Sequence, residues 1–321
     1  MMDTSGLHVA AALANWNGAR YLERCLTALR QQTHRLEKIV VVDNGSTDGS
    51  DLWLESQPDV TLIRHAHNTG YCHGYNRAIE ATDTPFVLTL NTDAFLEEHF
   101  VRACLETVVG APRCAAATGL FWEEATNQHI GGGFWLRRLM RMRPTPADED
   151  AREVFGVTGA AALFRREALD TVRIDGQIFD ESYFSYGEDI DLAWRLQSLG
   201  WHSMYVPTAK AHHVGSGSLD GALRFFDKPV FFQRQALRNR YLTLMKNASL
   251  LDSLQLVPAM FMGELLLWPL LFLRQPWRFP SLLKTPAELL VRLPRVWRWR
   301  REIQRRRSPE AGSVHRWLKG W

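Results

Sequence analysis

In the first hundred residues, short unbroken apolar runs alternate with segments whose apolar residues recur at helical spacing. Four short apolar runs have the length and the β-branched content of buried strands. They are residues 8–14, 38–42, 60–63 and 86–90. Residues 18–32 and 71–80, which lie between such runs, place apolar side chains at helical spacing. Strands and helices in alternation predict βαβ units and a mainly parallel sheet flanked by helices, an α/β fold.

The alternation resumes further along the chain. Residues 155–164 are apolar and rich in small side chains, and residues 188–199 have the spacing of a helix that Gly200 ends. A strand-like segment around residues 205–207 follows, and His212 and His213 come after it. Ligands of parallel sheets bind beyond the carboxyl ends of the strands. The polar residues just after each strand are therefore the candidate site residues.

The pattern changes after about residue 217. Residues 234–244 predict a helix, and residues 250–273 are strongly apolar. Pro258, Glu264 and Pro269 interrupt that apolar stretch and leave uncharged runs shorter than the roughly 20 residues that span a bilayer. We therefore expect an in-plane or re-entrant amphipathic element.

Charge divides the chain at a similar place. The net charge is only +3, but from residue 274 onward 13 Lys and Arg face 3 Asp and Glu, a net of +10. The preceding residues hold 25 against 32, a net of −7. Six of the twelve tryptophans lie from Trp268 onward, interleaved with arginine in residues 297–301. Tryptophan and arginine together suit an anionic membrane surface, and nucleic acid is the alternative partner.

These observations predict two domains and a compartment. Residues 1–220 form the α/β domain, and residues 221–321 form a helical, basic and Trp-rich membrane-associating extension. The four cysteines show no CxxC pairing, which favours a reducing compartment. The N-terminus lacks a charged segment followed by an apolar one, so we expect no signal peptide. The body is expected on the cytoplasmic side of a membrane.

Three acids follow predicted strands or begin a helix. Asp43 could accept hydrogen bonds from a nucleoside, Asp93 could hold a divalent cation, and Asp189 could serve as a general base. Each has a structural alternative: a turn former, an Asx-turn acid and a helix N-terminal acid, respectively. Asp191 fits a structural i,i+4 pair with Arg195.

Other motifs limit the chemistry. His212 and His213 are candidate metal ligands because they follow a strand downstream of the acids. The sequence contains no GxGxxG, GxxxxGK[ST], HExxH or CxxC motif. Phosphate-binding loops of the ATP type and metal sites built on the HExxH or CxxC pattern are thereby excluded.

Seven motifs occur together in a specific order. They are residues 14–18 (ANWNG), 42–50 (VDNGSTDGS), 68–71 (NTGY) with Gly74 and Asn76, 91–93 (NTD), 159–161 (GAA), 187–192 (GEDIDL), and His213 with Gly215 and Ser216. Over about residues 8–220 the chain resembles a family 2 glycosyltransferase with the GT-A fold. It is most similar to the rhamnosyltransferase-like branch that builds cell-envelope polysaccharides.

The resemblance implies roles for individual residues. Asp189 would be the catalytic base, and Asp93 and His213 would be metal ligands, with His212 as the fallback. The remaining matched residues would bind the nucleotide sugar: Ala14, Trp16, Asp43, Asn68, Gly70, Gly74, Asn76, Asn91, Thr92, Gly159 and Glu188. The cofactor would be Mg²⁺ or Mn²⁺.

The resemblance also implies a reaction. Asp189 would take the proton of an acceptor hydroxyl while its oxygen displaces a nucleoside diphosphate, so that the anomeric configuration inverts. The donor would be dTDP-rhamnose or another nucleotide sugar, and the acceptor a polyprenyl-diphosphate-linked glycan or a polysaccharide. The enzyme would act at the cytoplasmic face of the bacterial inner membrane, as a peripheral or monotopic protein, with no nucleic acid as partner.

The sequence departs from the family pattern at two places, and two other protein classes are alternatives. Asn91 stands where a DXD motif has its first acid, and residues 173–177 (RIDGQ) replace a commoner GGFDE-like pattern, which would alter the acceptor pocket. A sugar-nucleotide nucleotidyltransferase would share the fold but should carry a GxGTR-like loop, where this chain has residues 15–18 (NWNG). A nucleic-acid-binding protein would leave the ordered acids of the body unexplained.

Overall fold

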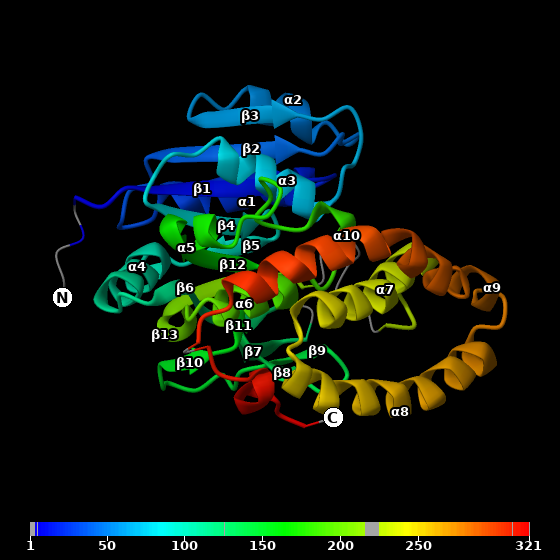
Figure 1. Ribbon diagram of the computed structural model, residues 1–321. Coiled ribbons are helices and arrows are strands. Elements are labelled where there is room, and N and C mark those ends of the chain that lie inside the picture. Colours follow the sequence, from blue (N-terminus) through cyan, green and yellow to red (C-terminus); the bar gives the residue numbers. More distant parts are fainter. Residues whose placement is uncertain (1–3, 5, 125, 216–224, 310, 321) are drawn as a thin grey trace.

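Four parallel strands form the N-terminal half of the central sheet (Figure 1). The protein is described here from a computed structural model, which covers residues 4, 6–124, 126–215, 225–309 and 311–320. The strands are β1 (Val9–Asn15), β2 (Lys38–Asp43), β3 (Val60–Arg64) and β4 (Phe86–Asn91), in the order β3-β2-β1-β4. The connecting helices are α1 (Ala19–Arg30), α2 (Ser50–Glu55) and α3 (Tyr71–Glu80). This half confirms the predicted βαβ units.

The second half of the sheet is mixed in direction. An antiparallel strand, β12 (Ala161–Arg165), lies between β4 and β6 (Cys114–Glu123), and β13 (His202–His213) runs parallel to β6. Shorter strands complete this sheet: β5 (Ala94–Leu96), β7 (Gln128–Gly131) and β10 (Arg152–Val154). A small second sheet contains β8 (Gly133–Arg137), β9 (Arg141–Pro144) and β11 (Gly156–Val157). The apolar stretch 155–164 is therefore divided between two sheets.

Four further short elements flank the strands. They are α4 (Phe100–Gly110), α5 (Arg166–Thr171), the 3-10 helix η1 (Glu181–Tyr183) and α6 (Glu188–Ser198). Helix α6 begins where the 187–192 motif predicts and ends two residues before Gly200, which has a positive φ of 81°.

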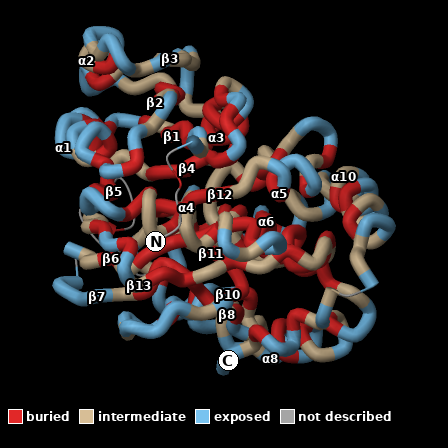
Figure 2. Tube along the Cα trace, turned by 90° about the vertical axis from the view of Figure 1, so that its left-hand side faces the viewer, coloured by how far each residue is buried: buried red, intermediate tan, exposed pale blue. Residues whose placement is uncertain are grey.

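The core lies on both faces of the sheet. Ala11 and Leu13 of β1 point to the face that α1 covers, and Ala12 points to the face that α3 covers. This two-sided burial explains the unbroken apolar sequence of β1 and β2, since no side chain of a central strand faces water. Figure 2 shows buried residues in these strands and in helices such as α3 and α6.

Four helices follow the sheet along the chain. They are α7 (Val230–Asn247), α8 (Leu250–Arg274), α9 (Phe279–Leu282) and α10 (Lys284–Arg306), with a 3-10 turn, η2 (Val314–Trp317), after them. The apolar stretch forms one continuous helix, since α8 has 25 residues and includes both Pro258 and Pro269. That it lies in the membrane plane or re-enters it stays a prediction. Ser249 and Asp252 form a capping box at its start.

Helix α8 has one packed face and one exposed apolar face. Leu256, Met260 and Leu271 are buried against the body, while the opposite side exposes large apolar side chains. The most exposed of these include Leu250, Leu254, Phe261, Leu266 and Leu273. By length and composition α8 could cross a membrane, although part of it is buried in the protein.

The basic C-terminal segment is largely docked onto the acidic body. Trp299 is fully buried, and its indole N–H donates to Asp175 Oδ2 at 3.0 Å. Arg298 pairs with the same carboxylate at 2.6 Å, and Arg295 pairs with Asp180 at 2.9 Å. Trp299 is therefore a core residue and cannot contact a membrane surface, whereas Trp297 is exposed. That the rest of this basic, Trp-rich segment associates with a membrane stays a prediction. Asp175 of the 173–177 segment contacts α10.

Candidate active site

A cavity of about 390 Å³ opens at the carboxyl ends of β1 and β4, beside the end of β13 and the start of α6. Eleven of the residues singled out from the sequence line it: Ala14, Trp16, Asn68, Gly70, Asn91, Thr92, Asp93, Gly159, Glu188, Asp189 and His213. Four do not line it: Asp43, Gly74, Asn76 and His212. Ser216 of the last motif lies outside the described residues, as does the expected domain boundary at 220.

Asp43 is buried, and both of its carboxylate oxygens accept hydrogen bonds from neighbouring residues. Its Oδ1 accepts from Asn15 Nδ2 at 2.7 Å and from Ser46 Oγ at 2.6 Å, and its Oδ2 accepts from the Ser46 N–H at 3.0 Å. These bonds hold the turn after β2, which is the structural alternative that the sequence left open. A direct contact between Asp43 and a nucleoside stays a prediction.

Asn76 and Gly74 support the cavity from outside. Asn76 donates to Phe179 O at 2.8 Å and accepts from the Phe179 N–H at 2.9 Å, so it ties α3 to the segment that leads to η1. A Cβ on Gly74 would lie 2.9 Å from Asn44 Nδ2 and 3.0 Å from Ala14 Cβ. Gly74 thus lets α3 lie close to the ends of β1 and β2, and Asn76 joins α3 to the residues before η1. Direct contact of either residue with a nucleotide sugar stays a prediction.

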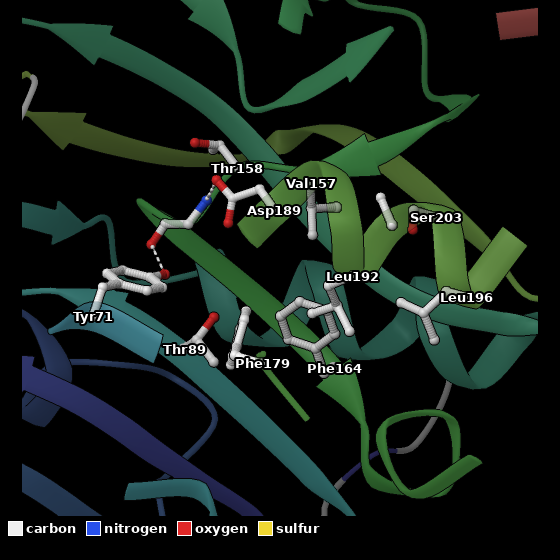
Figure 3. Close-up of a pocket in the computed structure, with 12 residues that line it drawn as sticks. Tyr71, Thr89, Val157, Thr158, Phe164, Phe179, Asp189, Leu192, Leu196 and Ser203 are labelled. Atoms are coloured by element: carbon white, nitrogen blue, oxygen red, sulfur yellow. Dashed lines mark hydrogen bonds between the residues drawn. The ribbon is translucent and has the colours of Figure 1, made fainter. Parts of the chain in front are cut away.

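The first turn of α6 brings Asp189 to the cavity. Figure 3 shows Asp189 with the residues of a smaller, adjoining cavity that it also lines. Gly187 precedes the helix with φ 89°, and Asp189 Oδ2 accepts from the Gly159 N–H at 3.1 Å. Position 159 requires glycine, because a Cβ there would lie 2.4 Å from Tyr71 Oη and 3.1 Å from Asp189 Oδ1. The small-residue motif 159–161 thus admits a carboxylate next to the backbone.

Apolar surroundings raise the pKa values of Asp189 and of the adjacent Glu188. Val157, Phe179 and Leu192 line a small cavity with Asp189, and burial raises the pKa of Asp189 to about 6, against the lowering effect of the Gly159 N–H. Burial, with the adjacent Asp189 carboxylate, raises the pKa of Glu188 well above its usual range. Its Oε2 is buried without a hydrogen-bond partner among the described residues. A carboxylate with a pKa near 6 is suited to accept a proton near neutral pH.

Asp93 and His213 face each other across the other side of the cavity. His213 Nε2 lies 3.6 Å from Asp93 Oδ1, and the Val214 N–H donates to Asp93 O at 3.0 Å. His213 Nε2 is buried and has no hydrogen-bond partner in the part of the chain that the structure describes. Neighbouring strand residues point to opposite faces, so His212 on β13 faces away from the cavity.

This pair offers two ligands to a divalent cation. A carboxylate oxygen and an imidazole nitrogen at that separation can both contact one ion, and the orphaned Nε2 fits such a role. No group of three His, Cys, Asp or Glu that could hold a metal is found among the described residues. A cation there would therefore need further oxygen ligands from a substrate or water.

Asn91 is held by an aromatic residue that the sequence did not single out. The buried Tyr75 hydroxyl donates to Asn91 Oδ1 at 2.9 Å. This bond leaves the amide N–H groups of Asn91 for the cavity, where an acid at the same position would present only acceptors. The site thus places one acid, Asp93, and one amide at the end of β4.

Sequence reasoning also missed the loop before α6. Phe184, Ser185 and Tyr186 line the cavity, and Phe184 and Tyr186 have positive φ values of 65° and 67°. Asn239 of α7 donates to the carbonyls of Tyr183, Ser185 and Tyr186 at 2.7–3.0 Å. No local periodicity could reveal this contact, because it joins residues more than fifty positions apart.

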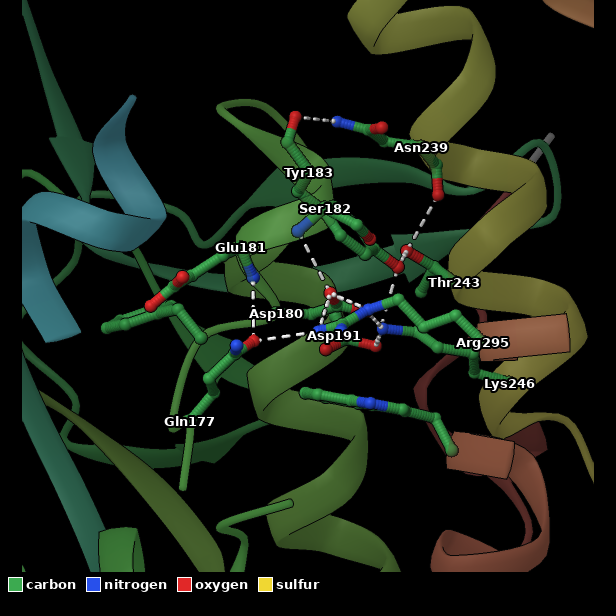
Figure 4. Close-up of polar contacts among 12 residues, drawn as sticks. Gln177, Asp180, Glu181, Ser182, Tyr183, Asp191, Asn239, Thr243, Lys246 and Arg295 are labelled. Atoms are coloured by element: carbon green, nitrogen blue, oxygen red, sulfur yellow. Dashed lines mark hydrogen bonds and ion pairs between the residues drawn. The ribbon is translucent and has the colours of Figure 1, made fainter. Parts of the chain in front are cut away.

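A buried ion network fixes the other side of this loop to the C-terminal helices (Figure 4). Lys246 Nζ lies 2.6 Å from Asp180 Oδ2 and 3.0 Å from Asp191 Oδ1. Arg195 pairs with Asp191 at 3.0 Å, which confirms the predicted i,i+4 pair. Burial alone would raise the pKa of Asp180, but Lys246 and Arg295 hold it well below its usual range.

Comparison with known proteins gives a consistent result. The glycosyl transferase family 2 sequence model matches residues 12–173. The chain is 31% identical over 232 residues to the N-acetylglucosaminyl-diphospho-decaprenol L-rhamnosyltransferase of Mycobacterium tuberculosis, covering 61% of this chain and 74% of that protein. It is 30% identical over 205 residues to the pre-mycofactocin glycosyltransferase of the same species, covering 61% of this chain and 40% of the relative.

Solved structures share the fold. GalNAc-T7 with UDP, GalNAc and Mn²⁺ has a TM-score of 0.61 at 14% identity, covering 75% of this chain and 48% of that one. A mannosyltransferase of Pyrobaculum calidifontis in complex with GDP-Man and Mn²⁺ has a TM-score of 0.52 at 16% identity, covering 93% and 85%. At these identities the similarity shows the GT-A fold alone.

Proposed function

The chain belongs to glycosyl transferase family 2, and we propose that it moves a rhamnosyl group from dTDP-rhamnose to a hydroxyl of a polyprenyl-diphosphate-linked glycan. It is a glycosyltransferase with a GT-A fold, similar to rhamnosyltransferases. The rhamnosyl group and the kind of acceptor are those in the name of the mycobacterial N-acetylglucosaminyl-diphospho-decaprenol L-rhamnosyltransferase, 74% of which is matched by this chain. The dTDP carrier is part of the proposal. The observation that carries the proposal is the carboxylate of Asp189, with a pKa of about 6, in the same cavity as Asp93 and His213.

Asp189 acts as the general base in this proposal. Its carboxylate takes the proton of the acceptor hydroxyl as the oxygen forms a bond to the anomeric carbon of the donor. The bond from that carbon to the diphosphate breaks on the opposite face, and the nucleoside diphosphate leaves with the electron pair. The configuration at the anomeric carbon inverts.

The remaining lining residues hold the donor. Trp16, which is partly exposed, offers an aromatic face to the nucleoside, and Asn91 offers amide donors to the diphosphate. Asp93 and His213 would hold Mg²⁺ or Mn²⁺, which would stabilise the negative charge of the leaving diphosphate. Burial raises the pKa of Glu188 and so favours its neutral form, which limits the negative charge beside Asp189.

The C-terminal helices hold the enzyme at the membrane in this proposal. The exposed apolar side of α8 would lie in the interface at the cytoplasmic face, and its packed side would stay on the protein. Residues 221–321 would then be a membrane-associating extension of a transferase domain formed by residues 1–220.

The test is turnover of a panel of nucleotide sugars with a prenyl-diphosphate-linked N-acetylglucosamine acceptor, with Mn²⁺ and with EDTA. We expect dTDP-rhamnose to be used, the product to have the inverted linkage by NMR, and Asp189→Asn to lose at least about 10²-fold in kcat. Asp51→Asn, which also changes an acid in the first turn of a helix but lies outside the cavity, should behave like wild type. Turnover of another donor alone would refute rhamnose, and binding of no nucleotide sugar at all would refute the proposed activity.

A further inference from the structure

A second cavity, of about 340 Å³, lies next to the active site. Its walls come from the turn between β8 and β9, the start of α6, α7 and α8. Met142, Tyr186 and Gly187 line this cavity and the active-site cavity alike. The two spaces therefore share one wall, two residues away from Asp189.

Three cations line the second cavity, which we call the cationic cavity: Arg141, Lys228 and Arg240. Arg240 is neutralised by Glu264 of α8 at 2.8 Å. Lys228 Nζ donates to Tyr186 Oη at 3.0 Å, and no acid pairs with it or with Arg141 among the described residues. Uncompensated like charges around a cavity favour an anionic ligand.

Most of the other residues that line the cationic cavity are apolar, apart from Tyr186 and Thr243. Leu139, Met140, Ile190, Leu237 and Leu267 contribute to its walls. Leu267 belongs to α8, whose neighbouring residues Leu266 and Leu270 are exposed on the apolar side of the helix. A ligand that fits this lining carries an anionic group and a hydrocarbon chain that can continue along α8.

We propose that the cationic cavity binds the diphosphate and the first prenyl units of the lipid-linked acceptor. This assignment rests on the proposed function and adds the site of acceptor binding to it. In such an acceptor the diphosphate is attached to one carbon of the sugar and the reacting hydroxyl to another. The sugar must therefore extend from the anion site to the base, as it does when it lies across Tyr186 and Gly187 towards Asp189.

The donor diphosphate is assigned to the active-site cavity because that cavity holds the candidate metal ligands. Asp93, His213 and the amide of Asn91 all lie in the active-site cavity, and none of them lines the cationic cavity. The two diphosphates of the reaction thus have separate sites, one suited to a metal complex and one built from Arg and Lys. Guanidinium and ammonium groups bind phosphate oxygens directly.

The test is equilibrium binding to the full chain in detergent, with farnesyl diphosphate, farnesol, inorganic diphosphate and dTDP as separate probes. We expect farnesyl diphosphate to bind more tightly than farnesol or inorganic diphosphate, and to bind alongside dTDP without competition. Arg141→Gln combined with Lys228→Gln should weaken farnesyl diphosphate binding at least tenfold and leave the dTDP affinity within twofold. Arg143→Gln is the matched control, because Arg143 lies on the same strand and lines neither cavity.

The outcomes separate the two proposals. Equal affinity of the double variant and wild type for farnesyl diphosphate, no binding to wild type, or displacement of dTDP would each overturn the acceptor site. An unchanged dTDP affinity and an unchanged melting temperature show that the double variant is folded, and should the double variant misfold, the same criterion applies to Arg141→Gln alone, an exposed position. Absence of any nucleotide or nucleotide-sugar binding would instead overturn the proposed function.

Discussion

At the scale of single residues, the position of the Asp189 carboxylate depends on the glycine at residue 159. Gly159 lets the carboxylate of Asp189 accept a backbone hydrogen bond, and the apolar residues behind it keep water away. The Gly159 N–H stabilises the charged form of Asp189, whereas burial destabilises it. The pKa of Asp189 is about 6, above the usual value for Asp, because burial is the larger effect.

The pKa of Asp189 predicts the pH dependence of turnover. A base must be deprotonated to act, so kcat/KM should rise with pH through about 6 and reach a plateau above pH 7. Leu192→Asn would place an amide next to the carboxylate and reduce its desolvation, which should move the rise to lower pH. The measurement is kcat/KM between pH 4.5 and 8.5 at saturating Mn²⁺. A rise at the same pH in both proteins would contradict burial as the cause.

The two adjacent histidines of β13 offer a matched pair of variants. His213→Ala removes the orphaned imidazole opposite Asp93, and we expect it to weaken Mn²⁺ binding in the presence of the donor diphosphate by about 10-fold or more. His212→Ala changes the same residue type one position away, outside the cavity, and should leave Mn²⁺ affinity unchanged. Mn²⁺ titration followed by electron paramagnetic resonance measures both. Equal losses in the two variants would contradict the assignment to His213.

At the scale of elements, the loop before α6 is positioned from a distant part of the chain. Asn239 of α7 satisfies three carbonyls of a loop with two non-glycine residues at positive φ. Such backbone geometry persists only where the surroundings fix it. Helix α7 therefore supports the loop beside the active-site cavity through Asn239 and also lines that cavity through Phe232.

The buried ion network makes a strong prediction for stability. Lys246→Met would leave Asp180 and Asp191 buried with one cation fewer, and we expect unfolding free energy to fall by about 3–5 kcal/mol. Arg298→Met breaks an ion pair at the surface and should cost at most about 1 kcal/mol. Urea unfolding of both variants provides the comparison. Equal losses would show that burial does not decide the energetics of these pairs.

Local pattern predicted some elements well and others not at all. The helix at residues 71–80 agrees with α3 at both ends, because its apolar face and the strands beside it are all local signals. The antiparallel insertion of β12 between β4 and β6 was not predictable, since strand order depends on pairing between distant segments. Most of the site followed from motifs at strand ends, whereas Tyr75, the 183–187 loop and α7 did not, because only the tertiary fold brings them to the cavity.

At the scale of the whole molecule, apolar surface is concentrated on α8 and its neighbours. Figure 1 shows α8 at the edge of the molecule, far from α2 and β3 at the other end. Exposed apolar surface of this extent is typical of an interaction site rather than of a monomer surface. Gly263 and Leu267 of the same helix line the cationic cavity, so the exposed apolar surface and the proposed acceptor site lie together.

The proposed membrane contact of this surface can be tested by placing acidic residues on α8. Leu266→Glu with Leu273→Glu changes two of the most exposed residues of α8, and we expect binding to anionic liposomes to fall at least about tenfold. Leu52→Glu, an equally simple change at an exposed leucine of α2, should have no effect. Liposome sedimentation gives the affinities, and melting temperatures show whether the proteins remain folded. Unchanged liposome binding in the α8 variant would contradict membrane contact through this face.

The contacts of Arg295 and Lys246 with buried acids of the body have a consequence for evolution. A cation lost from α7 or α10 leaves a buried acid behind, and an acid lost at Asp180 leaves the buried Lys246 behind. Substitutions at these positions should therefore be inherited in pairs. Among natural homologues, an exchange of the C-terminal helices between two lineages would succeed only when the acids at 180 and 191 are exchanged with them.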